Sequence, residues 1–292
     1  MARILLSPLL AALMSIGTPE VQAACFAPDT ALPNRREIMG DAHLGQTARD
    51  LALALLADEV ATARRLLESD PRLANEAVGS RHDMLSIAVA ACDPAVVELV
   101  LARGAAPDGV EGRGVPLQLA LRATRPDMAF LLLKRGGSPN PKGDPAGPIT
   151  TAIELNSLGG VRMLLDFRAD PNLAERTGNR PLQTALDMEH FRVAELLLDR
   201  DADPWAIDGG GANLGSSLAS PMGTLAPEES AARARLIKRL ARLGWPNPAP
   251  SPAEVRALAL AGKWPPSQAR AAGAAAVPAD VLALLLRHDP KK

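Results

Sequence analysis

Apolar and polar positions along this chain form a pattern that repeats about every 33 residues. In one copy, residues 180–188 read as a short helix, residues 191–200 carry apolar side chains at three-and-four spacing, and a polar turn follows. Three upstream stretches keep this order, with first helices at 84–91, 115–123 and 148–155 and second helices at 94–104, 127–136 and 160–168. The pattern predicts four pairs of short helices, each followed by a turn.

Two independent markers fix the period. The first is a small residue within each first helix, and it stands at Ala88, Ala120, Ala152 and Ala185, which are 32, 32 and 33 residues apart. The second is a proline after each second helix, and it stands at Pro107, Pro139, Pro171 and Pro204, with the same spacings. Because the two markers coincide, the chain contains an internal repeat of two helices and a turn.

Each predicted helix pair is too short to be stable alone in water. Stacking the pairs in single file hides the apolar stripe of each against its neighbour and leaves the turns projecting on one side. The second helices end at Gly104 and Gly136, which favour a left-handed cap, but Arg168 and Asp201 stand at the equivalent positions. We expect the left-handed backbone there too, at up to about 1 kcal/mol each.

The best copy, residues 168–204, resembles the ankyrin-repeat family. It contains Ala169-Asp170-Pro171-Asn172, Glu175, Gly178, Pro181-Leu182 and Ala185. The resemblance extends over residues 84–205 and implies an all-α fold, an α-solenoid of stacked ankyrin-type helix-turn-helix repeats. One departure concerns the family's Thr-Pro-Leu-His, which reads Arg180-Pro181-Leu182-Gln183 here. No copy keeps the His, so its hydrogen bonds between neighbouring repeats are either replaced or lost.

The predicted organisation follows from the repeat. An array spans residues 42–205, with an N-terminal cap at 42–75 and repeats at about 76–108, 109–140, 141–172 and 173–205. Residues 206–292 are interpreted as a divergent fifth repeat with an inserted loop, for which Ala219 is the marker, followed by a C-terminal helical cap. Whether the insertions at 206–230 and 262–278 are ordered is left open.

Residues 1–23 have the layout of a cleaved secretory signal peptide. An early Arg3 precedes an apolar run from Ile4 to Ile16 and a polar stretch that ends in small residues. The run is too short for a permanent membrane span, and no later segment suggests one. Cleavage would leave an extended segment, 24–41, and predicts a periplasmic protein. A lipid anchor at Cys25 is the minor alternative, because Gln22 stands where a lipobox has an apolar residue.

Cys25 and Cys92 are the two cysteines of the chain. In an oxidising compartment they could form a disulfide that holds segment 24–41 on the array. Two unpaired thiols are the equal alternative.

Composition and net charge indicate what the core is made of and which classes of partner are unfavoured. Apolar residues make up 47% of the chain and aromatic residues 2%, so the core is built from Leu, Ala and Val. The formal net charge of −1 argues against nucleic acid or an anionic membrane as partner.

No motif for catalysis, a cofactor or a metal is found. The four His residues lack metal-ligand spacing, and the glycines at 209–215 lack the Lys-Ser/Thr of a phosphate loop. The basic run from Arg233 to Arg242 is interpreted as a solvated helix face, with a binding patch for an acidic partner or lipid headgroup as the alternative. The chain is therefore predicted not to be an enzyme.

The resemblance implies a protein-binding scaffold whose contacts come from the turns and from first-helix positions on a concave surface. Carried over by position, the candidates are Glu111, Arg113, Arg122, Lys142, Asp144, Glu154, Arg176, Thr177, Asn179 and Asp187. Trp205 is a further candidate that could either anchor a partner or cover the end of the stack. We expect a monomer when free, with one protein partner. The sharper alternative is an immunity protein that neutralises a toxic secreted enzyme, and the rival class is an enzyme with its site in residues 206–292.

Overall fold

The computed structural model describes residues 25–27, 29–142, 147–175, 178–219 and 222–287, and the predicted signal peptide lies outside them. The chain divides into two compact units, residues 1–138 (unit 1) and residues 139–292 (unit 2). The division falls close to the predicted boundary between the repeats 109–140 and 141–172.

Unit 1 is built from consecutive helix pairs. They are α3 (Gln46–Leu56) with α4 (Val60–Ser69), α5 (Met84–Ala90) with α6 (Pro94–Ala102), and α7 (Pro116–Leu121) with α8 (Pro126–Lys134). A short helix, α2 (Arg35–Gly40), precedes them, and the 3-10 helix η1 (Pro71–Asn75) follows α4. The antiparallel strands β1 (Ala77–Val78) and β2 (His82–Asp83) form a small hairpin before α5.

Unit 2 continues with the same kind of pair. The pairs are α9 (Gly147–Glu154) with α10 (Leu158–Asp166), α11 (Pro181–Asp187) with α12 (Phe191–Leu198), and α13 (Leu214–Ala219) with α14 (Pro227–Arg242). After them come α15 (Pro252–Leu260), α16 (Ser267–Ala271) and α17 (Ala279–Arg287), of which α15 packs on α17.

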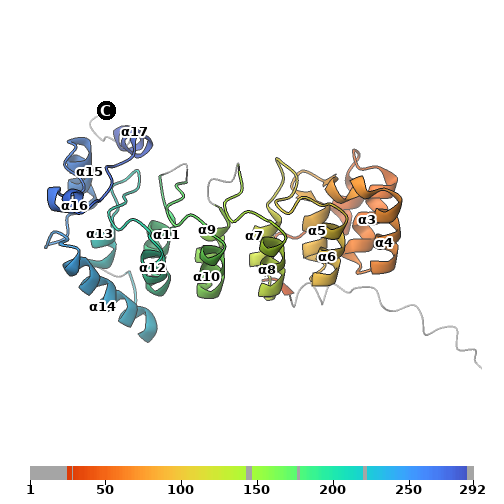
Figure 1. Ribbon diagram of the computed structural model, residues 1–292, viewed down its shortest axis with the longest axis horizontal. Helices are drawn as coiled ribbons and strands as arrows, with labels where there is room; N and C mark the ends of the chain where they lie inside the picture. The colour runs from red at the N-terminus through yellow and green to blue at the C-terminus, as the bar shows by residue number, and fades with distance from the viewer. Residues whose placement is uncertain (1–24, 28, 143–146, 176–177, 220–221, 288–292) are drawn as a thin grey trace, which may run out of the picture. The chain divides into compact units, whose positions relative to one another are not determined.

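Within each unit the pairs stack in chain order, as the repeat predicts (Figure 1). In unit 1, the first helices α3, α5 and α7 pack in sequence, and the second helices α4, α6 and α8 form a parallel row. In unit 2, α9, α11 and α13 form one row and α10, α12 and α14 the other. The core side chains lie between neighbouring pairs; Leu51, Ile87 and Leu132 are among the fully buried ones. The predicted all-α fold of stacked helix pairs is confirmed.

The second helices end as predicted. Gly104 and Gly136 have φ values of 93° and 95°, and Arg168 and Asp201 have values of 70° and 68°. The two non-glycine residues therefore adopt the left-handed conformation despite its steric cost. That cost indicates that contacts between repeats fix this backbone.

A ladder of side-chain to backbone hydrogen bonds supplies such contacts. The Asn75 side chain donates to the carbonyl of Gly104 at 2.7 Å and accepts from the amide of Ala106 at 2.8 Å. Asn140 makes the same pair of bonds to Arg168 and Asp170, and Asn172 makes it to Asp201 and Asp203. Asp108 accepts from the amide of Ser138. Each bond links a turn to the left-handed cap of the following second helix.

The missing family His is replaced in one repeat. Gln183, which stands at the His position, is buried and donates through Nε2 to the carbonyl of Ala206 at 2.9 Å. His190 also makes a contact between repeats, because its Nδ1 lies 2.9 Å from the carbonyl oxygen of Ile153. Both bonds join successive repeats of unit 2.

The segment 24–41, predicted to be extended, is partly helical. Residues 35–40 form α2, because the Asn34 side chain caps the helix by accepting from the amide of Glu37 at 3.0 Å. The sequence prediction missed this Asn cap.

The fifth repeat also differs from its prediction. Leu218, not Ala219, stands at the buried position of the first helix, since Leu218 is buried and Ala219 is exposed. The second helix α14 has 16 residues where α12 has 8, so part of the predicted insertion lengthens this helix instead of forming a loop. The Pro and Ala-rich stretch before α17 contains the short helix α16, which the sequence did not indicate.

Among the residues that the structure describes, no helix is long and apolar enough to cross a membrane.

The hydrogen-bond ladder gives a stability prediction. Asn172→Ala should lower the free energy of unfolding by about 1–2 kcal/mol, because the carbonyl of Asp201 and the amide of Asp203 both lose their partner. Asn172→Asp, which keeps the acceptor but loses the donor, should fall between Ala and wild type. Denaturant titration of the three proteins measures this. An Ala variant as stable as wild type would show that these hydrogen bonds do not contribute to the stability of the fold.

Candidate functional site

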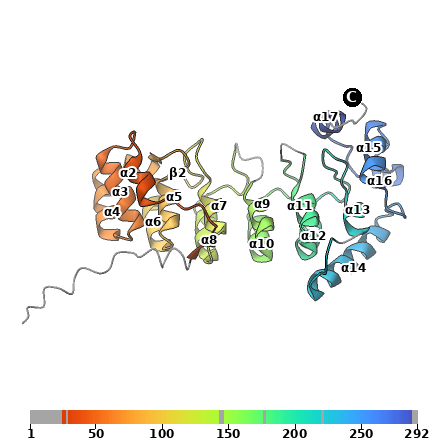
Figure 2. The same ribbon diagram turned by 180° about the vertical axis from the view of Figure 1, so that it is seen from behind.

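The N-terminal segment of unit 1 is fixed across the first helices. We define the strap as residues 25–27 and 29–34. Cys25 and Cys92 form a disulfide with a Cα–Cα distance of 6.3 Å, which is the pairing that the sequence left open. Phe26 forms a β-bridge with Ala123, and the amide of Thr124 donates to the carbonyl of Cys25 at 2.6 Å. The strap therefore reaches from α2 past α5 to the end of α7 (Figure 2).

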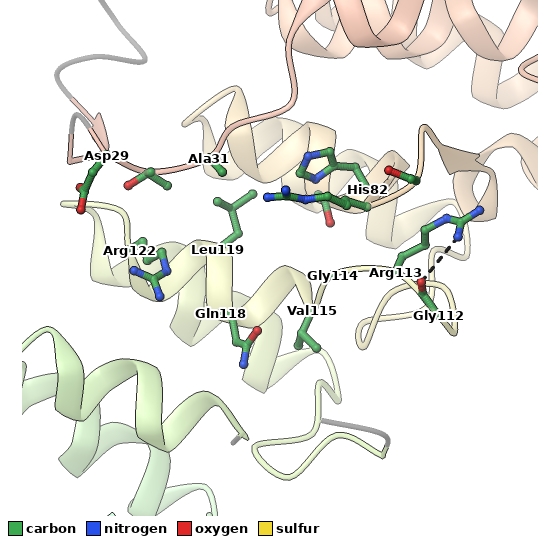
Figure 3. Close-up of a pocket in the computed structure, with 14 residues that line it drawn as sticks. Asp29, Ala31, His82, Gly112, Arg113, Gly114, Val115, Gln118, Leu119 and Arg122 are labelled. Carbon is green, nitrogen blue, oxygen red and sulfur yellow. Dashed lines mark hydrogen bonds between the residues drawn. The ribbon is translucent and has the colours of Figure 1, made fainter. Parts of the chain in front are cut away.

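A cavity of about 620 Å³ lies between the strap and the first-helix face of unit 1 (Figure 3). The strap, the β hairpin, the turn before α7 and α7 itself all contribute side chains or backbone to it. Its lining consists of Asp29, Thr30, Ala31, Ser80, Arg81, His82, Ser86, Gly112, Arg113, Gly114, Val115, Gln118, Leu119 and Arg122. This volume lies within the usual range for ligand pockets.

Asp83 fixes two walls of the cavity relative to one another. Its Oδ1 accepts from the amide of Ser86 at 2.7 Å and so caps α5, while its Oδ2 accepts from the amide of Val110 at 2.7 Å in the following turn. Gly109 has a φ of 80° and leaves room for this carboxylate, since a Cβ there would lie 2.4 Å from Oδ2. The amide of Gly114 donates to the carbonyl of Arg81 at 2.8 Å. The hairpin and the turn are thereby tied together.

Charged residues line part of the cavity. They are Arg81, Arg113, Arg122 and Asp29, and Arg113 also lines a neighbouring cavity with Glu37, Asp41 and Glu76. His82 adds no positive charge at neutral pH, because burial lowers the pKa of its imidazole. The carboxylate of Glu37, 3.8 Å away, opposes this effect of burial on the pKa.

Two predicted partner-binding residues line this cavity, at opposite ends of it (Figure 3). Arg113 comes from the turn before α7 and Arg122 from the end of α7, and both are half-buried. Glu111 lies in the same turn but is exposed outside the lining. The prediction missed Arg81 and the strap residues, because the sequence did not show that the disulfide would place the strap beside the first helices.

Of the candidates in unit 2 that the structure describes, Trp205 lines a cavity of about 510 Å³. Lys142 and Glu154 are exposed at separate positions. Asn179 and Asp187 are brought together, since the Asn179 side chain hydrogen-bonds to the Asp187 carboxylate. Asp187 keeps contact with solvent, yet partial burial raises the pKa of its carboxyl, and the charge of Asp208 raises it further. The remaining candidates, Asp144, Arg176 and Thr177, lie outside the described residues.

The sequence leaves Trp205 as either an anchor for a partner or a cover for the end of the stack, and the residue is buried, with 6% of its surface exposed. Its ring stacks on Trp245 at a centroid distance of 4.3 Å, and Trp264 packs edge-on against both. The indole of Trp264 donates to the Trp205 carbonyl at 3.0 Å. Gly215 makes room for this cluster, since a Cβ there would lie within 3.0 Å of the Trp245 ring. Trp205 therefore packs against the segments that follow it.

The basic run on α14 is engaged within unit 2. Arg235 makes a two-pronged ion pair with Glu195 of α12, at 2.7 and 2.6 Å, and Arg239 pairs with Asp199. Arg233 donates to the carbonyl of Leu218. These three side chains attach α14 to its neighbours, whereas Lys238 and Arg242 of the same run are exposed, as the predicted solvated face requires.

In the parts of the chain that the structure describes, no group of three His, Cys, Asp or Glu side chains is placed to hold a metal ion. The strap cavity is lined by a mixture of basic, acidic, polar and apolar residues. Pockets of this mixed kind are typical binding sites.

The chain resembles known repeat proteins over part of its length. Residues 117–208 match the family model described as ankyrin repeats (3 copies). The chain is 42% identical over 66 residues to cyclin-dependent kinase 4 inhibitor B of Rattus norvegicus, an alignment that covers 23% of this chain and 49% of that protein. It is 42% identical over 60 residues to the Mus musculus protein of the same name, which covers 20% and 45%. The chain thus spans about half the length of the curated relatives it matches.

Removing the disulfide should loosen the strap. In a Cys25→Ser, Cys92→Ser double variant, the amides of residues 29–32 and 34 should exchange faster and the strap should become sensitive to protease. The crosslink spans 67 residues, so its loss should also lower the free energy of unfolding by up to about 4 kcal/mol. Hydrogen exchange followed by mass spectrometry measures the first effect. Unchanged exchange in the strap would mean that the disulfide does not hold it.

The lowered pKa of His82 gives a pH dependence. Because the folded protein binds this proton less readily than the unfolded chain, His82 penalises folding as pH falls through about 6.5. Stability should therefore decrease between pH 7.5 and 5.5, and His82→Gln should reduce this decrease. Denaturant titrations at both pH values test it, with a variant of the exposed His43, His43→Gln, as the matched control. Equal slopes for wild type and His82→Gln would contradict this assignment.

Proposed function

We propose that this chain, which carries ankyrin repeats, is a non-catalytic scaffold of the bacterial cell envelope that binds a partner protein on the turn and first-helix surface. The observation that carries the proposal is that Arg113 and Arg122 both line one cavity of unit 1. These residues come from a turn and from a first helix, the two structural positions that the family resemblance assigns to partner contacts. Ankyrin repeats are protein-binding modules, and extended repeat surfaces bind macromolecules.

The disulfide supports the proposed location in the cell envelope. Disulfides persist in oxidising compartments such as the bacterial periplasm and are rare in the cytosol. The layout of residues 1–23 fits export to that compartment. Because the sulfur of Cys25 is bonded to Cys92, it is not available for a lipid, which favours export without an anchor at Cys25.

The divergent C-terminal region supports a binding role over an enzymatic one. Its aromatic residues form a packed cluster, and its arginines pair with α12, so both sets of side chains are used in holding unit 2 together. An enzymatic site there would have to be made from other groups.

An inhibitory role is the second candidate. The curated relatives are named as inhibitors of a cyclin-dependent kinase, and a named inhibitor of this kind is consistent with a scaffold that acts by occupying its partner. Applied to an exported protein, this role is that of an immunity protein that blocks a toxic secreted enzyme. A gene for such an enzyme beside the gene for this chain would favour it.

Site-specific photocrosslinking tests the proposal. A benzoylphenylalanine at position 119, in place of the cavity residue Leu119, should yield a covalent adduct with a partner protein in the cells that produce the chain. The same group at position 134, in place of exposed Lys134 at the end of α8, is the control and should give none. Adducts from position 134 alone would place the partner on the second helices and refute the proposed surface.

A further inference from the structure

We infer that unit 2 has a docking site of its own, a cavity beside Trp205 that binds an uncharged stretch of a partner polypeptide through one large apolar side chain. We define the Trp205 cavity as the space of about 510 Å³ between the turn at Asp203–Trp205, Leu243 at the end of α14, and α16 with the residues that follow it. This site goes beyond the surface proposed above, which lies in unit 1.

The wall formed by Trp205 is held in place by contacts within unit 2. The Trp205 ring stacks on the ring of Trp245 at a centroid distance of 4.3 Å, and the Trp264 indole donates to the Trp205 carbonyl at 3.0 Å. The amide of Trp205 donates to Oδ1 of Asp203 at 2.9 Å, which fixes the turn itself. A ligand therefore meets an ordered surface on this side and does not have to order it.

A second wall, formed by α16 and the residues that follow it, is fixed as well. Arg270 of α16 donates through Nη1 to the carbonyl of Gly262 at 2.9 Å, which ties the helix to the end of α15. Gly273 has a φ of 95°, a left-handed conformation that suits the end of a helix, and the amide of Ala274 donates to the carbonyl of Ala269 at 3.0 Å. The cavity is therefore preformed on both sides.

The shape of the cavity suits a large apolar side chain. Every residue that α16 and the following segment contribute to the lining is Ala or Gly. Leu243 borders the cavity from the end of α14 and is 37% exposed. An apolar side chain in the cavity would cover Leu243 and fill the space that the small residues leave, so that apolar surface is removed from water. The volume of about 510 Å³ also leaves room for the main chain that carries this side chain.

One guanidinium group in the lining lacks a hydrogen-bond acceptor. The side chain of Arg180 is 12% exposed, and its Nε is shielded from solvent and has no partner among the described residues. Its Nη1 lies 4.0 Å from Oδ2 of Asp203, which is too far for a hydrogen bond. Because a largely buried charged donor without an acceptor is unfavourable, a ligand that brings an acceptor to the guanidinium is favoured.

The charges of the lining favour a peptide group as this acceptor over a free carboxylate. Arg180 and Asp203 are the two charged residues of the lining, and their formal charges cancel. A peptide group offers a carbonyl to the guanidinium and an amide to the nearby Oδ2 of Asp203. A carboxylate would be repelled by Asp203, and a cation would be repelled by Arg180. The lining therefore selects an uncharged main chain together with an apolar side chain.

The test uses a random-peptide display library and the chain from residue 24 with its disulfide intact. Peptides that bind wild type but not a Leu243→Glu variant should share a large apolar residue and show no excess of charged residues. Their affinity for Leu243→Glu should be lower about tenfold or more. Leu260→Glu is the matched control, because Leu260 ends α15, is 39% exposed and lies outside the lining, and it should bind as wild type does.

A second pair of variants tests the volume of the cavity. Ala272→Trp places a large ring in the lining and should block binding, whereas Ala271→Trp, at the exposed neighbouring position outside the lining, should not. N-methylation of each amide of the tightest peptide tests main-chain recognition. One amide beside the apolar residue should lose about tenfold in affinity on methylation, because Asp203 then loses its donor.

Melting curves establish that the variants are folded, and if Leu243→Glu does not fold, the pair at positions 271 and 272 decides. Apolar peptides that bind Ala272→Trp as tightly as wild type would overturn the inference, as would selected peptides with an excess of charged residues. A peptide that tolerates methylation at every amide would also overturn it, and so would a library that yields no binder. A partner crosslinked from position 119 together with any of these results would leave the proposed function standing.

Discussion

The structure depends on one constraint: helices of about two turns cannot bury enough apolar surface to persist unless a neighbouring pair covers them. The second helices α6, α8 and α10 have 9 residues each, and the first helices α7 and α13 have 6. Isolated helices of this length are marginal in water. Each pair therefore derives its stability from the pairs beside it in the chain, and long-range order arises from nearest-neighbour contacts.

Hydrogen bonds complete what apolar stacking begins. Apolar contacts between smooth Leu and Ala surfaces tolerate sliding, whereas the bonds of Asn75, Asn140 and Asn172 to backbone groups fix the distance and register of the next repeat. The ladder ends at Trp205, which stands where an Asn would continue it. Beyond this position, the packing of Trp205, Trp245 and Trp264 replaces the Asn hydrogen bonds. The change from Asn to Trp therefore marks the end of the regular repeats and the start of the C-terminal elements.

This regular framework also positions the candidate site. Asp83 caps one helix and holds the turn of the next repeat with the same carboxylate, so the walls of the strap cavity have a fixed separation. The disulfide adds a wall that the repeats do not provide. Function in this account comes from an irregular segment placed on a regular scaffold.

The sequence predicted the features that recur and missed those that occur once. The period, the helix pairs and the left-handed caps at Arg168 and Asp201 could be predicted, because each is specified several times along the chain. Arg113 and Arg122 could be nominated from their places in the repeat. The role of Arg81, the helix at residues 35–40 and the burial of Trp205 depend on contacts between segments far apart in the chain, which no local pattern encodes. The three tryptophans lie at separate places in the sequence, and no spacing rule indicates that they meet.

Native-state hydrogen exchange tests the central claim, that neighbours stabilise each helix pair, most directly. The account predicts slower exchange in α5 and α6, which have a pair on each side within unit 1, than in α3 and α4. It likewise predicts slower exchange in α11 and α12 than in α15 and α17 of unit 2. Protection that is uniform throughout each unit would contradict the account, since it would mean that each unit opens as one cooperative body regardless of the position of a pair in the stack.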